Sequence, residues 1–108
     1  MKPSYEQAVL VHLPLTDHPF GSDRERAAIF GLADMLRDAI DDQGVGLFDG
    51  EAWGGGLCVL YMYGPDADRL FDVVAPILQK APLARGGFAI KQYGAPEDLS
   101  AREVRVDL

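Results

Sequence analysis

The chain of 108 residues has a single cysteine, two histidines and no long apolar run. Cys58 cannot form an internal disulfide, and this cysteine usage is typical of a reducing compartment. The apolar runs are too short for a membrane-spanning helix, and the first residues lack the apolar core of a signal peptide. We therefore expect a cytoplasmic protein that does not associate with membranes.

Cations are also scarce. Ten Lys and Arg residues stand against 17 Asp and Glu residues, which gives a net charge of −7. Nucleic-acid binding needs cations that displace phosphate counterions, and anionic membranes attract basic surfaces. The charge therefore disfavours both of these ligands. An apolar fraction of 48% is ordinary for a globular protein, and the length predicts a single domain over residues 1–108.

The motifs of common catalytic and metal sites are missing. The sequence contains no H-x-x-x-H, C-x-x-C or H-E-x-x-H spacing. Gly54-Gly-Gly56 precedes a strand and lacks a following Lys-Ser/Thr, so it predicts a turn and not a phosphate loop. Cys58 lies in an apolar stretch without a neighbouring cation, which favours a buried structural thiol. We therefore expect no cofactor, no metal and no catalytic residue, and favour a protein that is not an enzyme.

Hydrophobic periodicity predicts two helices and five strands. The helices are expected over residues 22–43 and 66–80, and the strands over residues 7–15, 45–53, 57–63, 88–93 and 103–108. Ser22-Asp-Arg-Glu25 has the spacing of a capping box, and Gly44 is placed to end the first helix. Pro76 is expected to kink or divide the second helix, because proline cannot donate a helical hydrogen bond.

This order of elements, β-α-β-β-α-β with a short final strand, predicts a ferredoxin-like α+β sandwich. We expect a four-stranded antiparallel sheet with both helices on one face, and residues 103–108 extending an edge. Strands 7–15 and 57–63 carry no charged residue and should be central, with strands 45–53 and 88–93 outside them. The residues expected between helices and sheet are Ile29, Leu32, Leu36, Leu70, Phe71, Val74, Ile77 and Leu78, with Val9, Val11, Val59 and Tyr61 on the sheet.

The two central strands lack charge on both faces, which is unusual for an antiparallel sheet with one face in water. An apolar face of this kind is typical of an interface. We therefore predict a homodimer that forms through the sheet face or an edge. The rival explanation is that the C-terminal segment folds across that face.

Acidic residues gather on the first helix. Asp34, Asp38, Asp41 and Asp42 share its C-terminal half, where like charges repel and the helix dipole disfavours anions. Such a face can be simply solvated, or it can bind a partner. Trp53, beside the glycine turn, either packs across the hairpin or is exposed for binding. Together these residues predict a non-enzymatic interaction or regulatory module whose acidic surface contacts a basic protein partner.

Two further sets of polar residues are candidates for chemistry. His12, Asp17 and His18 could converge at the end of the first strand as a metal or general-base site, or be a sheet histidine beside ordinary loop residues. Asp49 and Glu51 could share a strand face as paired carboxylates, or form a polar edge. Asp49-Gly50 also predicts a turn or bulge in its strand.

Part of the chain resembles a pattern in small bacterial proteins of unassigned function. The residues that carry it are Gly44-Val-Gly-Leu-Phe-Asp-Gly50, Gly54-Gly-Gly56 and Leu60-Tyr-Met-Tyr-Gly-Pro-Asp-Ala-Asp-Arg-Leu-Phe71. The likeness extends over about residues 23–93, implies a ferredoxin-like fold and brings no catalytic residues. In charge alone, the chain is also similar to acidic immunity proteins, which neutralise basic toxins.

The arrangement is similar, too, to ferredoxin-like small-ligand domains of the ACT type. These domains bind ligands around the loop after the first strand, which corresponds here to Thr16 to Ser22. The resemblance implies an alternative function as a small-molecule-binding regulatory domain, with His12, Asp17 and His18 as ligand-binding residues.

Overall fold

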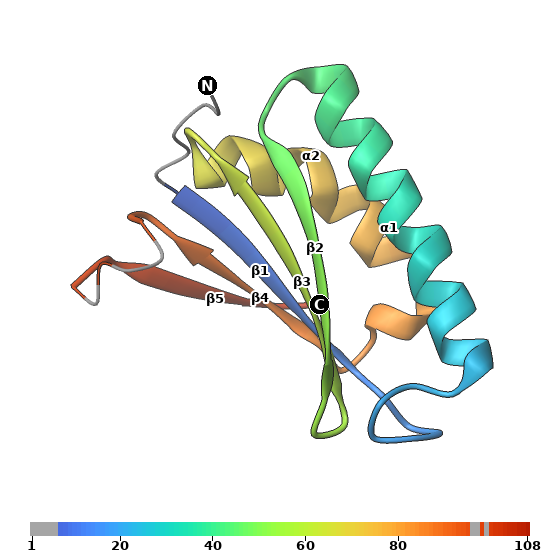
Figure 1. Cartoon of the computed structure of the whole chain (residues 1–108). Helices are drawn as coiled ribbons and strands as arrows, with labels where there is room; N and C mark the ends of the chain where they lie inside the picture. Colours follow the sequence, from blue (N-terminus) through green and yellow to red (C-terminus); the bar gives the residue numbers. More distant parts are fainter. Residues whose placement is uncertain (1–6, 96–97, 99) are drawn as a thin grey trace.

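The chain forms one antiparallel sheet with both helices packed on the same side of it (Figure 1). The computed structural model describes residues 7–95, 98 and 100–108. The elements are β1 (Gln7–Pro14), α1 (Asp23–Gln43), β2 (Leu47–Gly54), β3 (Leu57–Gly64), α2 (Ala67–Lys80), the 3-10 turn η1 (Pro82–Ala84), β4 (Phe88–Gln92) and β5 (Glu103–Asp107). The α+β class predicted from the sequence is therefore confirmed.

Local capping signals set the helix ends. Ser22 Oγ accepts the Glu25 N–H at 3.2 Å while the Glu25 carboxylate accepts the Ser22 N–H, so the predicted capping box is present. Gly44 ends α1 in the left-handed conformation with φ 62°, which costs glycine little. Pro76 lies inside α2, which continues unbroken to Lys80. Of the two predicted outcomes, a kink or a division, the helix is not divided; Pro76 lies at an exposed position, where water can satisfy the freed carbonyl.

The sheet has five strands in the order β2-β3-β1-β4-β5, not the four that the sequence predicted. The predicted extension of one edge by residues 103–108 is present, and it forms the fifth strand, β5. β5 pairs with β4 along its whole length, from Phe88↔Asp107 to Gln92↔Glu103. β4 is therefore an inner strand, and the edges of the sheet are β2 and β5. β1 is the central strand, because β3 and β4 pair on its two sides.

One face of the sheet packs against the helices and contains the core. Val9, Val11 and Leu13 of β1 are fully buried there, and so are Cys58, Leu60 and Met62 of β3. The expectation that Val59 and Tyr61 face the helices is wrong. The register pairs Val9 with Met62 and Leu10 with Tyr61, and paired residues share a face, so Val59 and Tyr61 point to the other side.

That other side, which we call the open face, carries apolar and aromatic side chains from neighbouring strands. Its half-buried members are Leu10, His12, Val59, Tyr61, Tyr63, Phe88 and Ile90. Within the described residues no helix lies over it (Figure 1). β5 lies at the edge of the sheet and does not fold across the face.

Candidate functional site

The C-terminal half of α1 presents a surface rich in carboxylates. Asp34, Asp38, Asp41 and Asp42 are all exposed. Arg37 Nη1 pairs with Asp34 at 3.1 Å, and in the described part of the chain the other three aspartates have no ion pair. The last turn of α1 contains no basic residue, and its carbonyl ends add a partial negative charge. The structure therefore concentrates negative potential at this end of the helix.

An apolar side chain lies within this acidic region. Met35 is 57% exposed and stands three and four residues before Asp38 and Ala39, so the three share one side of the helix. Asp38, Ala39, Asp41 and Asp42 line a shallow hollow in the surface. We call the set Asp34, Met35, Asp38, Ala39, Asp41 and Asp42 the acidic surface. No group of three or more His, Cys, Asp or Glu residues in the described ranges is placed to hold a metal ion.

Trp53 lies beside the N-terminal half of α1. Its indole packs against the start of α1, with the Arg26 guanidinium 4.6 Å from the ring centroid and the Phe30 ring 5.9 Å away. Gly21, at φ 80°, leaves room for the ring, because a Cβ there would approach it to 2.8 Å. Asp38 lies two turns further along α1 than Phe30, about 12 Å away along the axis. Asp34, at the start of the acidic surface, is one turn from Phe30, so Trp53 adjoins only that end of the surface and lies away from Asp38, Asp41 and Asp42.

A cavity of about 420 Å³ opens beside the loop that follows β1. Its walls come from the end of β1, the loop, the first turns of α1, and η1. The lining residues are Pro14, Leu15, Thr16, Asp17, Arg24, Glu25, Ala28, Ile29, Pro82, Leu83 and Arg85. The volume falls within the range of small-molecule sites. This cavity adjoins the loop Thr16–Ser22 that the ACT-like resemblance implies.

The three residues predicted for a ligand site do not meet in this cavity. Asp17 lines it and accepts a hydrogen bond from the Ser22 hydroxyl at 3.1 Å. His18 lies in a separate hollow beside the hairpin turn, and its Nδ1 accepts the Phe20 N–H at 3.1 Å. His12 is on the open face, because it alternates with the buried Val11 and Leu13.

Glu25 is the most strongly bound carboxylate at the cavity. Its Oε2 accepts the Thr16 N–H at 2.8 Å, and its Oε1 accepts the N–H groups of Asp17 and Ser22 at 3.2 Å each. These backbone hydrogen bonds, that of Thr16 first, lower the pKa of Glu25. The side chain therefore holds the loop against α1.

Two arginines at the cavity were not found from the sequence. Arg24 and Arg85 both line it, and neither forms an ion pair with another described residue. They come from the first turn of α1 and the residue after η1, so only the fold brings them to one cavity. No spacing in the sequence could have indicated them.

His12 is held in a stack on the open face. Its ring lies 4.4 Å from the Phe88 ring, almost parallel to it, and the Arg105 guanidinium lies 3.9 Å from the Phe88 ring centroid. The Nδ1 atom of His12 is buried and makes no hydrogen bond with the described residues. Burial lowers the pKa of His12, with a smaller opposing effect from the Leu10 carbonyl and a further lowering by Arg105.

Asp49 is the inserted residue of a bulge in β2, and Glu51 follows two residues later. The register shifts between Phe48 and Gly50, which confirms the predicted irregularity. Glu51 pairs with the core residue Leu60, whereas Asp49 has no partner on β3. The bulge interrupts the alternation of side chains, so the two carboxylates lose the shared face that simple i, i+2 spacing predicts.

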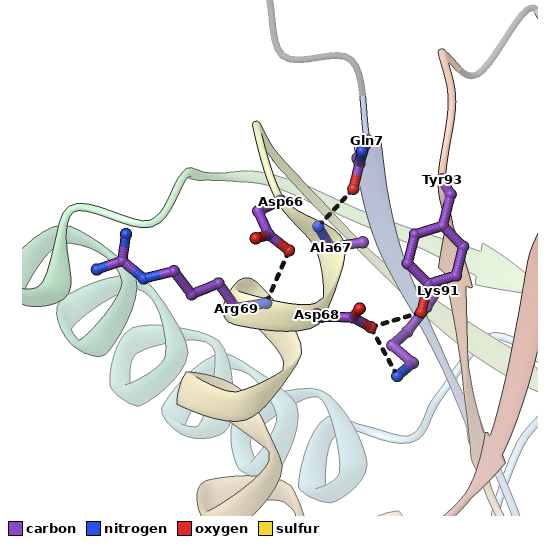
Figure 2. A network of polar contacts seen from close by, with 7 residues as sticks. All are labelled: Gln7, Asp66, Ala67, Asp68, Arg69, Lys91 and Tyr93. Carbon is purple, nitrogen blue, oxygen red and sulfur yellow. Dashed lines mark hydrogen bonds and ion pairs between the residues drawn. The ribbon is translucent and has the colours of Figure 1, made fainter.

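A polar network joins the start of α2 to the sheet (Figure 2). The Gln7 side chain accepts the Ala67 N–H at 2.8 Å, and Asp66 caps the helix by accepting the Arg69 N–H. Asp68 Oδ1 accepts hydrogen bonds from the Tyr93 hydroxyl and from Lys91 Nζ.

This network is structural in character. The Tyr93 hydrogen bond and then Lys91 lower the pKa of Asp68, and Asp68 in turn raises the pKa of Lys91. Both groups therefore stay ionised at neutral pH, where Lys91 can act neither as a base nor as a nucleophile. The contacts fasten α2 to β1 and β4.

No protein-family model, curated protein or solved structure matches this chain. The resemblance to small bacterial proteins and to ACT-type domains therefore stays a prediction. No helix among the described residues is long and apolar enough to cross a membrane.

Proposed function

We propose that this protein is a non-enzymatic interaction module whose acidic surface on α1 binds a basic segment of another protein. One observation carries the proposal: the exposed carboxylates Asp38, Asp41 and Asp42 stand at the negative end of a helix, without a cation paired to them in the described chain. A solvated helix end is normally stabilised by basic residues in its last turn. The last turn of α1 contains no basic residue and lacks this stabilisation.

The chemistry of the surface favours a basic peptide segment over a metal ion. The carboxylates are spread over two turns of α1 and do not converge as ligands. The exposed Met35 beside them adds an adaptable apolar contact. A partner that alternates Lys or Arg with an apolar side chain would match both features.

A lysine-rich peptide containing one leucine is a direct probe of this proposal. Calorimetric binding should weaken as salt rises, because the Debye length falls from about 10 Å at 0.1 M to about 3 Å at 1 M. The double variant Asp38→Asn/Asp41→Asn should bind about two- to thirtyfold less tightly, since exposed ion pairs contribute roughly 0.2–1 kcal/mol each.

The matched control removes two exposed charges elsewhere, in the double variant Asp49→Asn/Asp72→Asn. It should bind the peptide almost as the wild type does. Equal weakening in both double variants would mean that only net charge matters, and the proposed surface would be refuted.

The cavity beside the loop after β1 supports a second candidate function, that of a small-molecule-binding regulatory domain. Arg24 and Arg85 are both at the cavity, so its ligand would carry a carboxylate or a similar anion. A panel of small carboxylic acids should then raise the thermal midpoint of the wild type but not that of Arg24→Ala or Arg85→Ala. A shift that survives both substitutions would place the ligand elsewhere.

A further inference from the structure

We propose that two copies of this chain pair through their open faces, with the sheets stacked against each other. This inference is independent of the acidic surface, which lies on the opposite side of the sheet. It rests on the composition of the open face, on unpartnered polar atoms within it, and on its area and charge.

The open face has the anatomy of an interface core with a polar rim. In strands β1, β3 and β4 its accessible residues are uncharged: Leu10, His12, Pro14, Leu57, Val59, Tyr61, Tyr63, Phe88 and Ile90. Ala8 and Gln92 point to the same side but are buried. Charged side chains appear only toward the sheet edges, as Glu103, Arg105 and Asp107 on β5 and Asp49 on β2. Aromatic residues at the centre and charges at the margin are typical of protein–protein contacts.

Polar atoms on this face lack partners within the described chain. The hydroxyls of Tyr61 and Tyr63 donate no hydrogen bond to another described residue, and His12 Nδ1 is buried without a partner. Burial, and then Asp49, raise the pKa of Tyr63, so its hydroxyl keeps its proton at neutral pH. Tyrosines of this kind can bury their rings at an interface and hydrogen-bond across it.

The area of the face suits a second copy. Strands lie about 4.8 Å apart and rise about 3.3 Å per residue. The five strands together, edges included, therefore present roughly 500 Å² per copy, and pairing would bury about 1,000 Å². This lies at the lower limit of specific interfaces, and we expect a dimer that dissociates in the micromolar range.

Charge also favours a second copy over a basic partner on this face. Three central strands without a carboxylate offer nothing that selects a cation. In a stacked pair each layer adds about 10 Å. The two α1 helices then lie on the order of 30 Å apart, which is several times the Debye length of about 8 Å at physiological salt. The acidity of the chain therefore does not oppose pairing, and the dimer displays two acidic surfaces on its outer sides.

Sedimentation velocity over a concentration series tests the proposal. The wild type should shift from monomer to dimer as its concentration rises through the micromolar range. Tyr61→Glu and Ile90→Lys should stay monomeric, with unchanged circular dichroism, because each places a charge on the open face. Met35→Glu adds the same negative charge as Tyr61→Glu, but on α1, and should dimerise normally. A wild type that remains monomeric at high micromolar concentration, or dimers that persist in both open-face variants, would overturn the proposal.

Cross-linking locates the contact. Leu10 is near the middle of the central strand, so its two copies should meet close to the two-fold axis. Leu10→Cys should be joined into a dimer by a bis-maleimide of about 10 Å reach, which matches the spacing of stacked sheets. Met35→Cys is the control, and the native Cys58 is buried toward the helices. Equal cross-linking of both variants would contradict the stacked arrangement, while peptide binding to α1 would be unaffected by that outcome.

Discussion

A pair of isosteric substitutions can decide which side of β3 faces the helices. Val11 and Val59 stand on neighbouring strands, but Val11 is fully buried toward the helices and Val59 is half-buried on the open face. Valine and threonine have almost the same shape, so Val→Thr exchanges a methyl for a hydroxyl without leaving a cavity. The two variants then differ only in what surrounds the hydroxyl.

The expected costs differ severalfold. In Val11→Thr the hydroxyl enters the core between the sheet and the helices, and burying such a group without a good partner costs about 1–3 kcal/mol. In Val59→Thr the hydroxyl reaches water, and we expect a change within about 0.5 kcal/mol, as for other solvent-accessible substitutions.

Urea unfolding followed by the fluorescence of Trp53 measures both costs. The protein should be dilute enough to be monomeric, because association would add stability that depends on concentration. The slope of the transition should not change, so that midpoints can be compared. If Val59→Thr loses as much stability as Val11→Thr, then Val59 faces the helices and there is no open face as described.

Three other properties follow from the side-chain environments. Burial lowers the pKa of His12 from 6.5, so the unfolded chain binds this proton more readily and stability should fall as the pH drops from 7 to 5. His12→Phe should reduce that fall, and an unchanged fall in this variant would contradict the burial of His12. Burial, and then Glu51, raise the pKa of Cys58 to about 12, so a thiol reagent at pH 8 should react only at the rate of unfolding, and rapid labelling of the native protein would contradict its position. Glu25→Gln should increase hydrogen exchange at the amides of Thr16, Asp17 and Ser22, and unchanged protection there would show that Glu25 does not hold the loop.

Features governed by short stretches of sequence were predictable. The capping box at Ser22 and Glu25 and the left-handed Gly44 depend only on contacts a few residues apart, and both are present. The order of strands and helices follows from periodicity in the same way. The bulge beside Asp49-Gly50 was also indicated locally.

Features that depend on pairing between distant segments could not be predicted from the sequence. β3 has no charge on either side, so alternation could not tell Val59 from Leu60, and only the register with β1 decides between them. The sequence predicted that residues 103–108 extend an edge of the sheet, but not that they pair with β4 and so make it an inner strand. The cavity arginines Arg24 and Arg85 are 61 residues apart in the sequence.

The proposed function is tested most directly by nuclear magnetic resonance of the ¹⁵N-labelled protein during titration with the lysine-rich peptide. The spectrum reports on the acidic surface, the loop cavity and the open face at the same time. We expect amide shifts confined to about residues 34–43 of α1, which disappear at high salt. Shifts confined to residues 14–17, 24–29 and 82–85, or to the strands of the open face, would contradict the assignment of the acidic surface as the binding site.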